Sequence, residues 1–448
     1  MNLMNVYNRL PAWCQTLAVS LEGFRIRRKR YDAEFERQYQ DFMSRNNWTY
    51  EQKCAYRDEQ LRRMVRHCYE TVPYYRNLFD RLQIDYREIR TLEDLHRLPL
   101  LDKQTVRAHY DDFFSTLYPR ESLMEQHTSG STGSGFSFYQ NREAHAAVWA
   151  HVWRGNHNIG LSRTMWCAYF GGRSIVPPQK KHGPFYRINY PGRQIMFSIF
   201  HMHDQAFAQW LKVLNHRRPP WIQGYPSALL PFAAYLEQTG QRLQYTPQVI
   251  TLSSENVSPA QEDYLARIFG VYPMQNYAQC EAVATFRQRL DRRIFVDEDF
   301  SAVELIPTGQ DGLCKIVGTT LSNYAMPFLR YDTKDLATWR LTEEGREILS
   351  LDGRDEDDIR LRDGGTVRRL SRVFQDQPRI TEAQILQHSL DFIEFHVVPA
   401  ADYTPEDEQR LRQTIDSYLT DRIGWEIVHT DHVRRNKNGK VRFIISEL

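Results

Sequence analysis

The sequence lacks the cysteine patterns of metal centres and disulfide-rich scaffolds. Its 448 residues include six cysteines, and no two of them form a CxxC pair or a cluster with histidine. Scattered cysteines of this kind are typical of free, mostly buried thiols in a reducing compartment. We therefore expect a cytoplasmic protein without a zinc site.

Long apolar runs are also missing. No run approaches the roughly 18 residues that a membrane-spanning helix needs. The basic cluster 25–30 follows the apolar stretch 10–24 instead of preceding it, so the N-terminus does not have the order of a secretion signal. The stretch is predicted to form a helix packed on the core, and peripheral contact of this helix with a membrane surface stays open as an alternative.

An excess of charge of one sign is absent as well. The net charge is +2, and the many arginines are interleaved with acidic residues. This pattern is typical of solvated helix faces and gives no indication of a nucleic-acid partner. The length is sufficient for a large buried core and for two or more domains.

Apolar periodicity predicts an α/β protein. Residues 1–120 are mostly helical in pattern, and strand-like and helical segments then alternate as far as about residue 269, with strands such as 249–252 and helices such as 143–157, 231–238 and 259–269. Such alternation predicts a largely parallel sheet. In these sheets ligands bind at the loops that follow the strands.

A change of pattern indicates a second, smaller domain. Past about residue 285 the chain is rich in strand-like segments, and a polar turn precedes Gly353. We expect a large N-terminal domain over residues 1–352 with mixed and parallel sheets. A small α+β domain is expected over residues 353–448.

One loop has a composition that is suited to binding a polyphosphate. Residues 128–135 consist only of serine, threonine and glycine, so they provide hydroxyl groups and accessible backbone amides, as wrapping of a polyphosphate requires. The alternative is a flexible Gly/Ser turn. A Walker A or dinucleotide-binding loop would open a helix, and a Walker A loop would contain a lysine. Here residues 136–140 alternate like a strand, which disfavours both of these readings.

Five motifs in a fixed order resemble the acyl-adenylate-forming (ANL) superfamily, whose members activate a carboxylate with ATP to give an acyl-AMP and pyrophosphate. They are Thr128–Gly133, Asn276–Glu281, Tyr331–Asp335, Gly353-Arg354 and the segment Asn438–Val441. The first resembles the family's phosphate loop, which lies on a β-hairpin. The resemblance implies a large adenylate-forming domain followed by a small mobile lid.

A closer resemblance extends over nearly the whole chain. The segments that carry it are Val72–Tyr75, Phe170–Arg173, Pro184–Arg187, Ile222–Leu229 and Lys440–Ser446. They are similar to the phenylacetate–CoA ligase-like branch, and most like the CapK-type proteins of surface-polysaccharide biosynthesis. This resemblance indicates the chemistry better than it indicates the metabolite.

The resemblance implies roles for individual residues. Lys440 would supply positive charge where the carboxylate meets the α-phosphate, and Glu281 would hold Mg²⁺, which prefers carboxylate oxygen. The residues implied in nucleotide binding are Thr128, Ser129, Gly130, Ser131, Thr132, Gly133, Ser254, Glu255, Asn276, Tyr277, Asp335 and Arg354. Asp335 would accept hydrogen bonds from the ribose, Tyr277 would pack on adenine, and Glu356 would lie at the hinge.

The carboxylic acid substrate is expected to bind at another part of the chain. The turn of Gly224, Tyr225, Pro226 and Ser227 would line the acyl pocket by the same resemblance. His201 is a further candidate for contact with the substrate.

Each candidate also has a structural interpretation. Lys440 could be an ordinary surface lysine, Glu281 an acid at a helix N-terminus and Asp335 an acid in a turn. Likewise, Tyr277 could be a core aromatic residue, and His201 could be a buried histidine with a purely structural role.

Several residues depart from the family pattern. Ser134-Gly135 stands where a proline and a following lysine are usual, and Cys280 replaces threonine. Lys334 replaces glycine beside the ribose-binding aspartate, and Glu356 replaces an aspartate. We expect these changes to affect nucleotide affinity and domain rotation more than the adenylation reaction itself.

The sequence thus predicts a ligase that uses ATP and Mg²⁺ to convert a small carboxylic acid to an acyl-AMP. The acyl group would then pass to CoA, or to an amine or hydroxyl group of a sugar or amino acid. A catalytically degenerate homologue that binds a nucleotide or a protein partner is the alternative. ATP–pyrophosphate exchange separates the two, and a phosphoryl-transferring enzyme would release ADP instead of AMP.

Overall fold

The computed structural model describes residues 3–127, 136–177, 179–255, 257–309, 312–354, 359–363, 365–367, 370–374, 377, 379–400, 402–419, 422–436, 439 and 441–448. These residues form two compact units. Unit 1 comprises Met1–Arg27, Arg163–Gln275 and Asp355–Leu448, and unit 2 comprises Arg28–Ser162 and Asn276–Arg354. The predicted domain division at residues 352 and 353 stays a prediction.

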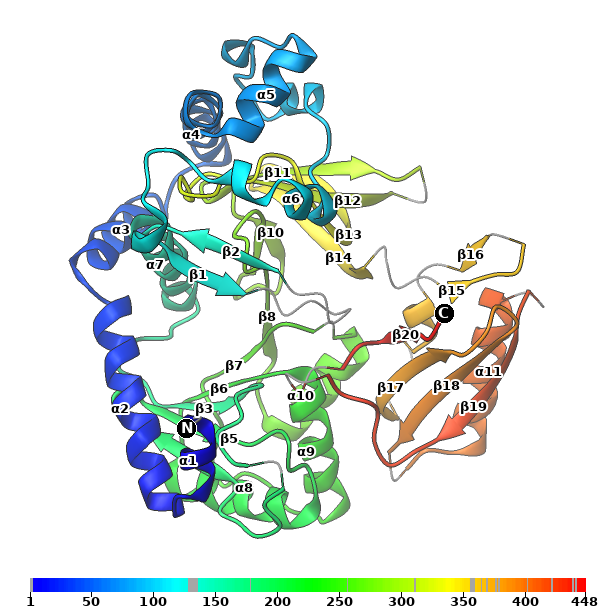
Figure 1. Ribbon diagram of the computed structural model, residues 1–448. Helices are drawn as coiled ribbons and strands as arrows, with labels where there is room; N and C mark the ends of the chain where they lie inside the picture. The colour runs from blue at the N-terminus through cyan, green and yellow to red at the C-terminus, as the bar shows by residue number, and fades with distance from the viewer. Residues whose placement is uncertain are drawn as a thin grey trace. The chain divides into compact units, whose positions relative to one another are not determined.

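Unit 1 contains a mostly parallel sheet (Figure 1). Its strand order is β8-β7-β6-β3-β5-β4, and the pairs are parallel except for β4 with β5. The strands are β3 (Cys167–Phe170), β4 (Tyr186–Asn189), β5 (Gln194–Phe197), β6 (Trp221–Gly224), β7 (Val249–Leu252) and β8 (Pro273–Ala278). The last three residues of β8 belong to unit 2. The predicted α/β class is confirmed.

Helices pack on this sheet through a single apolar core. They are α8 (Asp204–Arg217), α9 (Pro226–Gln238) and α10 (Pro259–Phe269). Trp210 of α8 and Phe232 of α9 are fully buried and lie 5.7 Å apart between ring centroids. The periodicity predicted α10 correctly, but it placed the start of α9 at Pro231, whereas the helix begins at Pro226 and carries Pro231 inside it.

The N-terminal helices α1 (Leu3–Arg9) and α2 (Ala12–Arg30) precede this sheet in the chain. Residues 12–24 of the apolar stretch are helical, as predicted, and one side of α2 packs on the rest of unit 1. Among the helices of the described residues, none is long and apolar enough to cross a membrane.

The C-terminal part of unit 1 has a sheet and a core of its own. Its strand order is β19-β18-β17-β20, from β17 (Ile380–Gln387), β18 (Phe392–Pro399), β19 (Gly424–His429) and β20 (Ile444–Ser446). The short strands β15 (Ile359–Arg360) and β16 (Thr366–Val367) form a separate pair. Helix α11 (Pro405–Leu419) buries Leu411, Ile415 and Leu419 against β17 and β18. This is the α+β segment that the sequence predicts.

Unit 2 is built on an antiparallel sheet with helices beside it (Figure 1). Its order is β11-β12-β13-β14-β10-β9-β8. The strands are β9 (Thr285–Gln288), β10 (Ile294–Val296), β11 (Ser301–Pro307), β12 (Leu313–Thr320), β13 (Tyr331–Thr342) and β14 (Gly345–Arg354). The helices are α3 (Ala33–Ser44), α4 (Tyr50–Thr71), α5 (Pro73–Leu82), α6 (Lys103–Ala108) and α7 (Arg142–Asn158), and α3 packs along α7.

A β-hairpin in unit 2 carries the phosphate-loop sequence. Strands β1 (Met124–His127) and β2 (Ser137–Gln140) pair antiparallel, with His127 opposite Ser137. The two strands predicted on either side of the loop sequence are therefore confirmed. Residues 128–135 themselves lie outside the described residues.

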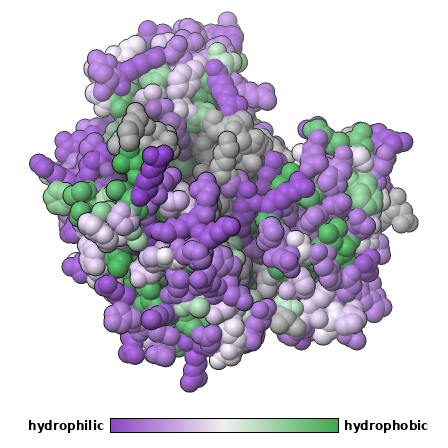
Figure 2. Space-filling model, turned by 60° about the horizontal axis from the view of Figure 1, so that its bottom comes forward, coloured by the Kyte–Doolittle hydropathy of each residue, from purple (hydrophilic) through white to green (hydrophobic). Residues whose placement is uncertain are grey.

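The surface is mainly hydrophilic on the face that Figure 2 shows. Hydrophobic residues on that face form small groups with hydrophilic residues between them.

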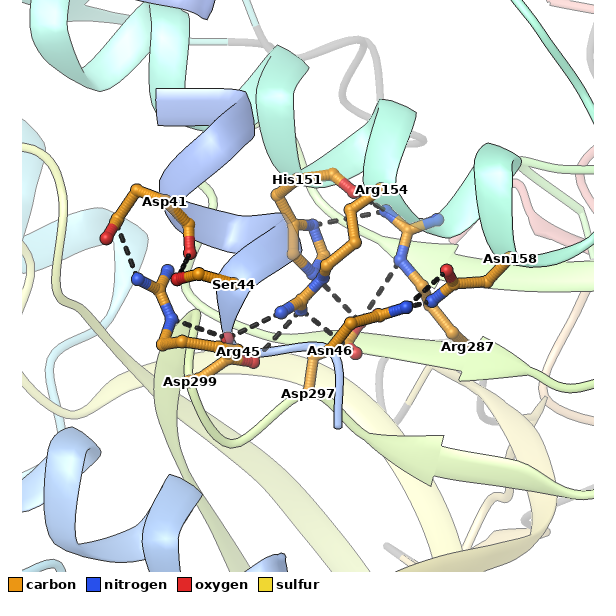
Figure 3. A network of polar contacts seen from close by, with 10 residues as sticks. All are labelled: Asp41, Ser44, Arg45, Asn46, His151, Arg154, Asn158, Arg287, Asp297 and Asp299. Carbon is orange, nitrogen blue, oxygen red and sulfur yellow. Dashed lines mark hydrogen bonds and ion pairs between the residues drawn. The ribbon is translucent and has the colours of Figure 1, made fainter. Parts of the chain in front are cut away.

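A network of buried charged side chains stabilises the loop between β10 and β11 (Figure 3). Asp299 is 1% exposed and binds Arg154 at 2.9 Å and Arg45 at 3.0 Å. Asp297 lies 3.0 Å from the buried His151 and 3.2 Å from Arg287. The network therefore joins this loop to α3, α7 and β9.

Glu298, the acidic residue between Asp297 and Asp299, is also paired with buried arginines. Glu298 is 2% exposed and accepts hydrogen bonds from Arg57 at 2.8 Å and from Arg346 at 2.7 Å. Three consecutive acids thus each meet at least one buried cation, as buried charges require.

Candidate active site

The turn between β6 and α9 is a tightly packed part of unit 1. A Cβ atom on Gly224 would lie 2.9 Å from the Cβ of Phe170, so this position has no room for a larger residue. The backbone N–H of Tyr225 donates to the carbonyl of Phe170 at 3.1 Å, and burial raises the pKa of Tyr225 to about 12. Pro226 opens α9, where its fixed φ suits the first helical turn.

Glu255 caps this helix from a distant part of the chain. Tyr225 is the N-cap residue but makes no side-chain cap. Instead, the carboxylate of Glu255 accepts hydrogen bonds from the N–H of Ser227 at 3.0 Å and from its hydroxyl at 2.9 Å. Helix N-termini favour negative charge. Burial nevertheless raises the pKa of Glu255, and its hydrogen bonds only partly offset that effect.

An arginine near the C-terminus binds the same turn. Arg435 donates to the carbonyl oxygen of Ser227 at 2.8 Å and to its hydroxyl at 2.9 Å, and it also pairs with Glu382 of β17. The N–H of Val441 donates to Glu255 at 3.1 Å. These contacts connect the segment that contains position 440 to the turn predicted to line the acyl pocket.

Gly439, the residue that precedes position 440, is also closely packed. Gly439 has φ +75°, and a Cβ there would lie 2.7 Å from the side chain of Ile199. Lys440 itself lies outside the described residues, as does Glu356. Their proposed roles stay predictions.

His201 lies in the core of unit 1. It is 4% exposed, stacks on Phe185 with 4.8 Å between ring centroids, and lies 2.8 Å from the hydroxyl of Ser198. Burial lowers the pKa of His201. These contacts account for the residue structurally, so a role in substrate contact rests on the sequence prediction alone.

A polar cluster in unit 2 surrounds Asp335 of β13. The hydroxyl of Tyr277, on β8, donates to the carboxylate at 2.8 Å, and the side chain of Gln279 lies 3.5 Å from the same oxygen. The N–H of Asp335 donates to Thr333 at 3.1 Å. Tyr277 also stacks on Phe286, with ring centroids 4.7 Å apart. The structure thus brings together two residues that were predicted to hold the nucleoside.

Strand register brings a third predicted residue to this cluster. β13 and β14 pair antiparallel with Asp335 opposite Arg354. The backbone of Arg354 therefore lies across from the aspartate that it was predicted to assist. Asn276, the neighbour of Tyr277 on β8, lies opposite Arg287 of β9.

Lys334 occupies the position where the family pattern has glycine, and its backbone shows why glycine is suitable there. Its φ is +64°, in the left-handed region that disfavours a residue with a Cβ. Its ammonium group lies 3.0 Å from Asp332, and its N–H donates to the same residue at 2.9 Å. The cation is thus paired with Asp332.

Glu281 lies in the turn between β8 and β9, not at a helix N-terminus. It is 9% exposed, and the hydroxyl of Tyr331 lies 3.4 Å from its carboxylate. No group of three or more potential metal ligands occurs among the described residues. One carboxylate fits Mg²⁺ delivered with a nucleotide, because that ion is commonly held by one or two carboxylates together with substrate phosphates. Cys280 beside it is exposed.

Each acid of the candidate site adjoins a residue with positive φ. Ser254 precedes Glu255 with φ +71°, Ala282 follows Glu281 with φ +56°, and Lys334 precedes Asp335. Such backbone conformations cost of order 1–3 kcal/mol and concentrate at functional sites. Their position therefore supports the prediction that each of these turns has a functional role.

Comparison with known proteins agrees with this geometry. Residues 361–447 match the family model of the CapK C-terminal domain. The chain is 21% identical to Protein CapK of Staphylococcus aureus over 99% of both chains. It is 26% identical to phenylacetate-coenzyme A ligase of Thermus thermophilus over 63% of this chain and 64% of that protein. The predicted resemblance to the acyl-adenylate-forming superfamily is therefore confirmed.

The matches also agree with the predicted similarity to the phenylacetate–CoA ligase-like branch and to CapK. A solved 2-hydroxyisobutyryl-CoA ligase in the postadenylation state, in complex with R3-HIB-AMP, shares the fold of this chain. The two match with a TM-score of 0.67 at 16% identity, over 87% of this chain and 89% of that one.

Several parts of the candidate site lie outside the described residues. They include the phosphate-loop residues Thr128, Ser129, Gly130, Ser131, Thr132 and Gly133. The hairpin register places the ends of that loop on paired strands, at His127 and Ser137.

Sequence reasoning missed the residues that hold the site together. Arg435 and Glu382 were not singled out, although the run Arg434-Arg435 shortly before Lys440 was a usable signal. Gln279 lies inside the predicted motif Asn276–Glu281 but was given no role. The pairing of Glu255 with Ser227 had no signal in the sequence, since 28 residues separate them.

Proposed function

We propose that the chain activates a small carboxylic acid with ATP. The carboxylate oxygen attacks the α-phosphorus, the bond between the α- and β-phosphoryl groups breaks, and pyrophosphate leaves. An acceptor thiol then attacks the acyl carbon and releases AMP. The arrangement of Tyr277, Asp335 and Arg354 is the observation that carries the proposal, because it suits a nucleoside at the position that the superfamily motifs predict.

Individual residues of this chain would have separate roles in the reaction. Asp335 would accept hydrogen bonds from the ribose hydroxyls, and Glu281 would hold Mg²⁺, whose chemistry is to neutralise the phosphate oxygens. Lys440 would place a positive charge between the carboxylate and the α-phosphate. The turn 224–227 would form one wall of the acyl pocket, and the phosphate loop would wrap the leaving pyrophosphate.

The C-terminal residues would act as a lid. Residues 359–448 have their own core, and the contacts of Gly439 and Val441 support delivery of Lys440 close to the turn 224–227. Rotation near Arg354 and Glu356 after adenylation would then admit the acceptor.

CoA is the acceptor that we favour, because the relatives include phenylacetate–CoA ligases. An amine or hydroxyl acceptor is the competing choice. The similarity to CapK supports a role in surface-polysaccharide biosynthesis. We expect the reaction in the cytoplasm, where ATP and CoA are present.

ATP–pyrophosphate exchange across a panel of carboxylic acids tests the proposal. Exchange should depend on one class of acid and should fall about a hundredfold or more in Lys440→Ala, because the developing charge is no longer neutralised. Lys437→Ala, three residues away, is the matched control and should retain exchange. The nucleotide product should be AMP, and release of ADP would contradict the mechanism.

The same assay addresses the alternative of a degenerate homologue. Tight ATP binding without exchange for any acid of the panel would count against the proposal. Adding CoA or an amine to the preformed acyl-AMP, and measuring which one accelerates AMP release, then identifies the acceptor.

A further inference from the structure

Helix α2 buries one side only. Val19 packs on the core of unit 1, and the hydroxyl of Ser20 donates to the carbonyl of Ile188 at 3.1 Å. Gly23 lies so close to Asn189 that a Cβ would overlap its side chain. These contacts fix the orientation of α2 and determine which of its faces points outward.

The outward face is apolar. Trp13, Leu17, Leu21 and Phe24 are 71%, 55%, 65% and 58% exposed. Their spacing of four, four and three residues places them within about 80° of the helix circumference. In Figure 1, α2 is drawn near the left edge of the view. An apolar stripe on a single helix is a typical interaction site, whereas scattered exposed leucines need no explanation.

The stripe runs into a basic helix end. Arg28 follows Phe24 by four residues and therefore lies on the same face. Lys29 is exposed beside it, and five basic residues of α2 stand against one acid, Glu22, which pairs with Arg25. The charge of this helix end is thus strongly positive.

An exposed aromatic residue in the turn after β4 lies next to the helix. The N–H of Tyr190 is 3.3 Å from the hydroxyl of Ser20, and the residue is 52% exposed. Tyrosine and tryptophan favour the boundary between lipid headgroups and acyl chains.

We propose that the outer face of α2 docks on the surface of a lipid bilayer with anionic headgroups. The apolar residues enter the headgroup boundary while Arg28 and Lys29 bind lipid phosphates, as an amphipathic helix with a basic flank does. Self-association through this face would offer only the same net-basic patch again, because a two-fold contact uses one patch twice, whereas anionic headgroups supply the opposite charge. Charge complementarity therefore favours the bilayer. This inference does not depend on the proposed reaction.

Co-sedimentation of the full chain with vesicles tests the proposal. The chain should sediment with vesicles of equimolar phosphatidylcholine and phosphatidylglycerol, and at least about tenfold less with phosphatidylcholine alone. Binding to the anionic vesicles should weaken as salt is added, because salt screens the attraction. This salt dependence needs no variant.

Two pairs of substitutions locate the contact. Leu17→Gln with Leu21→Gln should weaken vesicle binding at least about tenfold by removing the apolar contribution. Arg28→Gln with Lys29→Gln should weaken it about ten- to thirtyfold. All four positions are exposed, so the unfolding temperature should not change.

Matched controls lie on other elements. Leu290 and Leu341 are 72% and 62% exposed, and changing both to Gln should leave vesicle binding unchanged. The exposed basic residues Lys212 and Arg217 of α8 give the corresponding charge control.

Three outcomes overturn the proposal. One is the absence of sedimentation with anionic vesicles, and another is equal binding by wild type and both α2 variants. The third is a dimer in sedimentation velocity that Leu17→Gln with Leu21→Gln converts to monomer without any vesicle binding, which would make the stripe a self-association surface.

Discussion

The environment of Asp335 is what an acceptor of two ribose hydroxyls requires. One of its oxygens already receives the Tyr277 hydroxyl, and its backbone N–H is fixed by Thr333. The carboxylate is therefore oriented before any ligand arrives, and preorganisation of this kind lowers the cost of binding.

We predict that Tyr277→Phe raises the KM for ATP in the exchange assay about tenfold. The reason is the loss of one hydrogen bond to a charged acceptor, which is worth about 1.5 kcal/mol. Asp335→Ala should raise the KM much further. Tyr272→Phe is the matched control, since its hydroxyl also binds a carboxylate, that of Glu262 at 3.0 Å. An unchanged KM in Tyr277→Phe would show that the hydroxyl does not orient Asp335 for ATP.

At the scale of elements, the loop between β10 and β11 depends on its buried charges. Burial acts to raise the pKa of Asp299, but the charges of Arg154 and Arg45 outweigh this and hold the pKa well below its usual value. Removing one member of such a network leaves a partner buried without compensation, which typically costs 3–5 kcal/mol.

His151 makes this network sensitive to acid. Burial lowers its pKa from 6.5 to about 4, and Arg287 adds to that effect while Asp297 opposes it. Between these two values the unfolded chain binds a proton that the folded chain does not. The stabilisation of the folded state that follows from the low pKa of His151 is therefore fully present above pH 6.5. It is lost as the pH falls to about 4.

We predict that the free energy of unfolding decreases by about 3 kcal/mol from this residue over that range. Urea unfolding of wild type and His151→Gln between pH 4 and 7 measures it, and the difference between the two proteins should vary with pH in this window. His216→Gln, at an exposed position of α8, is the control for loss of an imidazole. A difference that is constant with pH would mean that His151 does not titrate in this way.

Local elements were predictable where a single physical signal dominates. Helix α10 begins at Pro259 after the capping residue Ser258 and ends at Gly270 with φ +77°, and these signals are visible in the sequence. The start of α9 was misplaced because its cap comes from Glu255 and not from the residue before the helix. The network of Asp299 was not predicted because Arg45 lies 254 residues away along the chain.

At the scale of the molecule, unit 1 is assembled from three separate stretches of chain. The contact between Ser227 and Arg435 joins two of them across 208 residues. Both carboxylates near this arginine, Glu255 and Glu382, have pKa values raised by burial, so its charge matters to each.

We predict that Arg435→Met lowers the ATP–pyrophosphate exchange rate about tenfold or more, because the segment that carries Lys440 loses its hold on the turn 224–227. Acyl transfer from preformed acyl-AMP should change little if the lid leaves this position before transfer. Arg434→Met is the matched control, since that exposed neighbour pairs with Glu447 at 2.8 Å. Equal losses in both reactions would indicate a structural role for Arg435.

The motif order allowed the superfamily to be predicted from the sequence, since each motif is a local turn with its own residue requirements. The positive φ at Lys334, for example, explains why the family pattern has glycine there. The contacts of Arg435 could not be predicted in this way, because they depend on how distant stretches pack together.

One small feature gives this protein a practical handle. All six cysteines are described, and Cys280 is the exposed one, beside the carboxylate proposed to hold Mg²⁺. A maleimide should therefore modify Cys280 first, and bound nucleotide should slow the modification by covering it. The labelling rate then reports how much of the protein carries nucleotide, so ATP affinity can be measured before the acid is known.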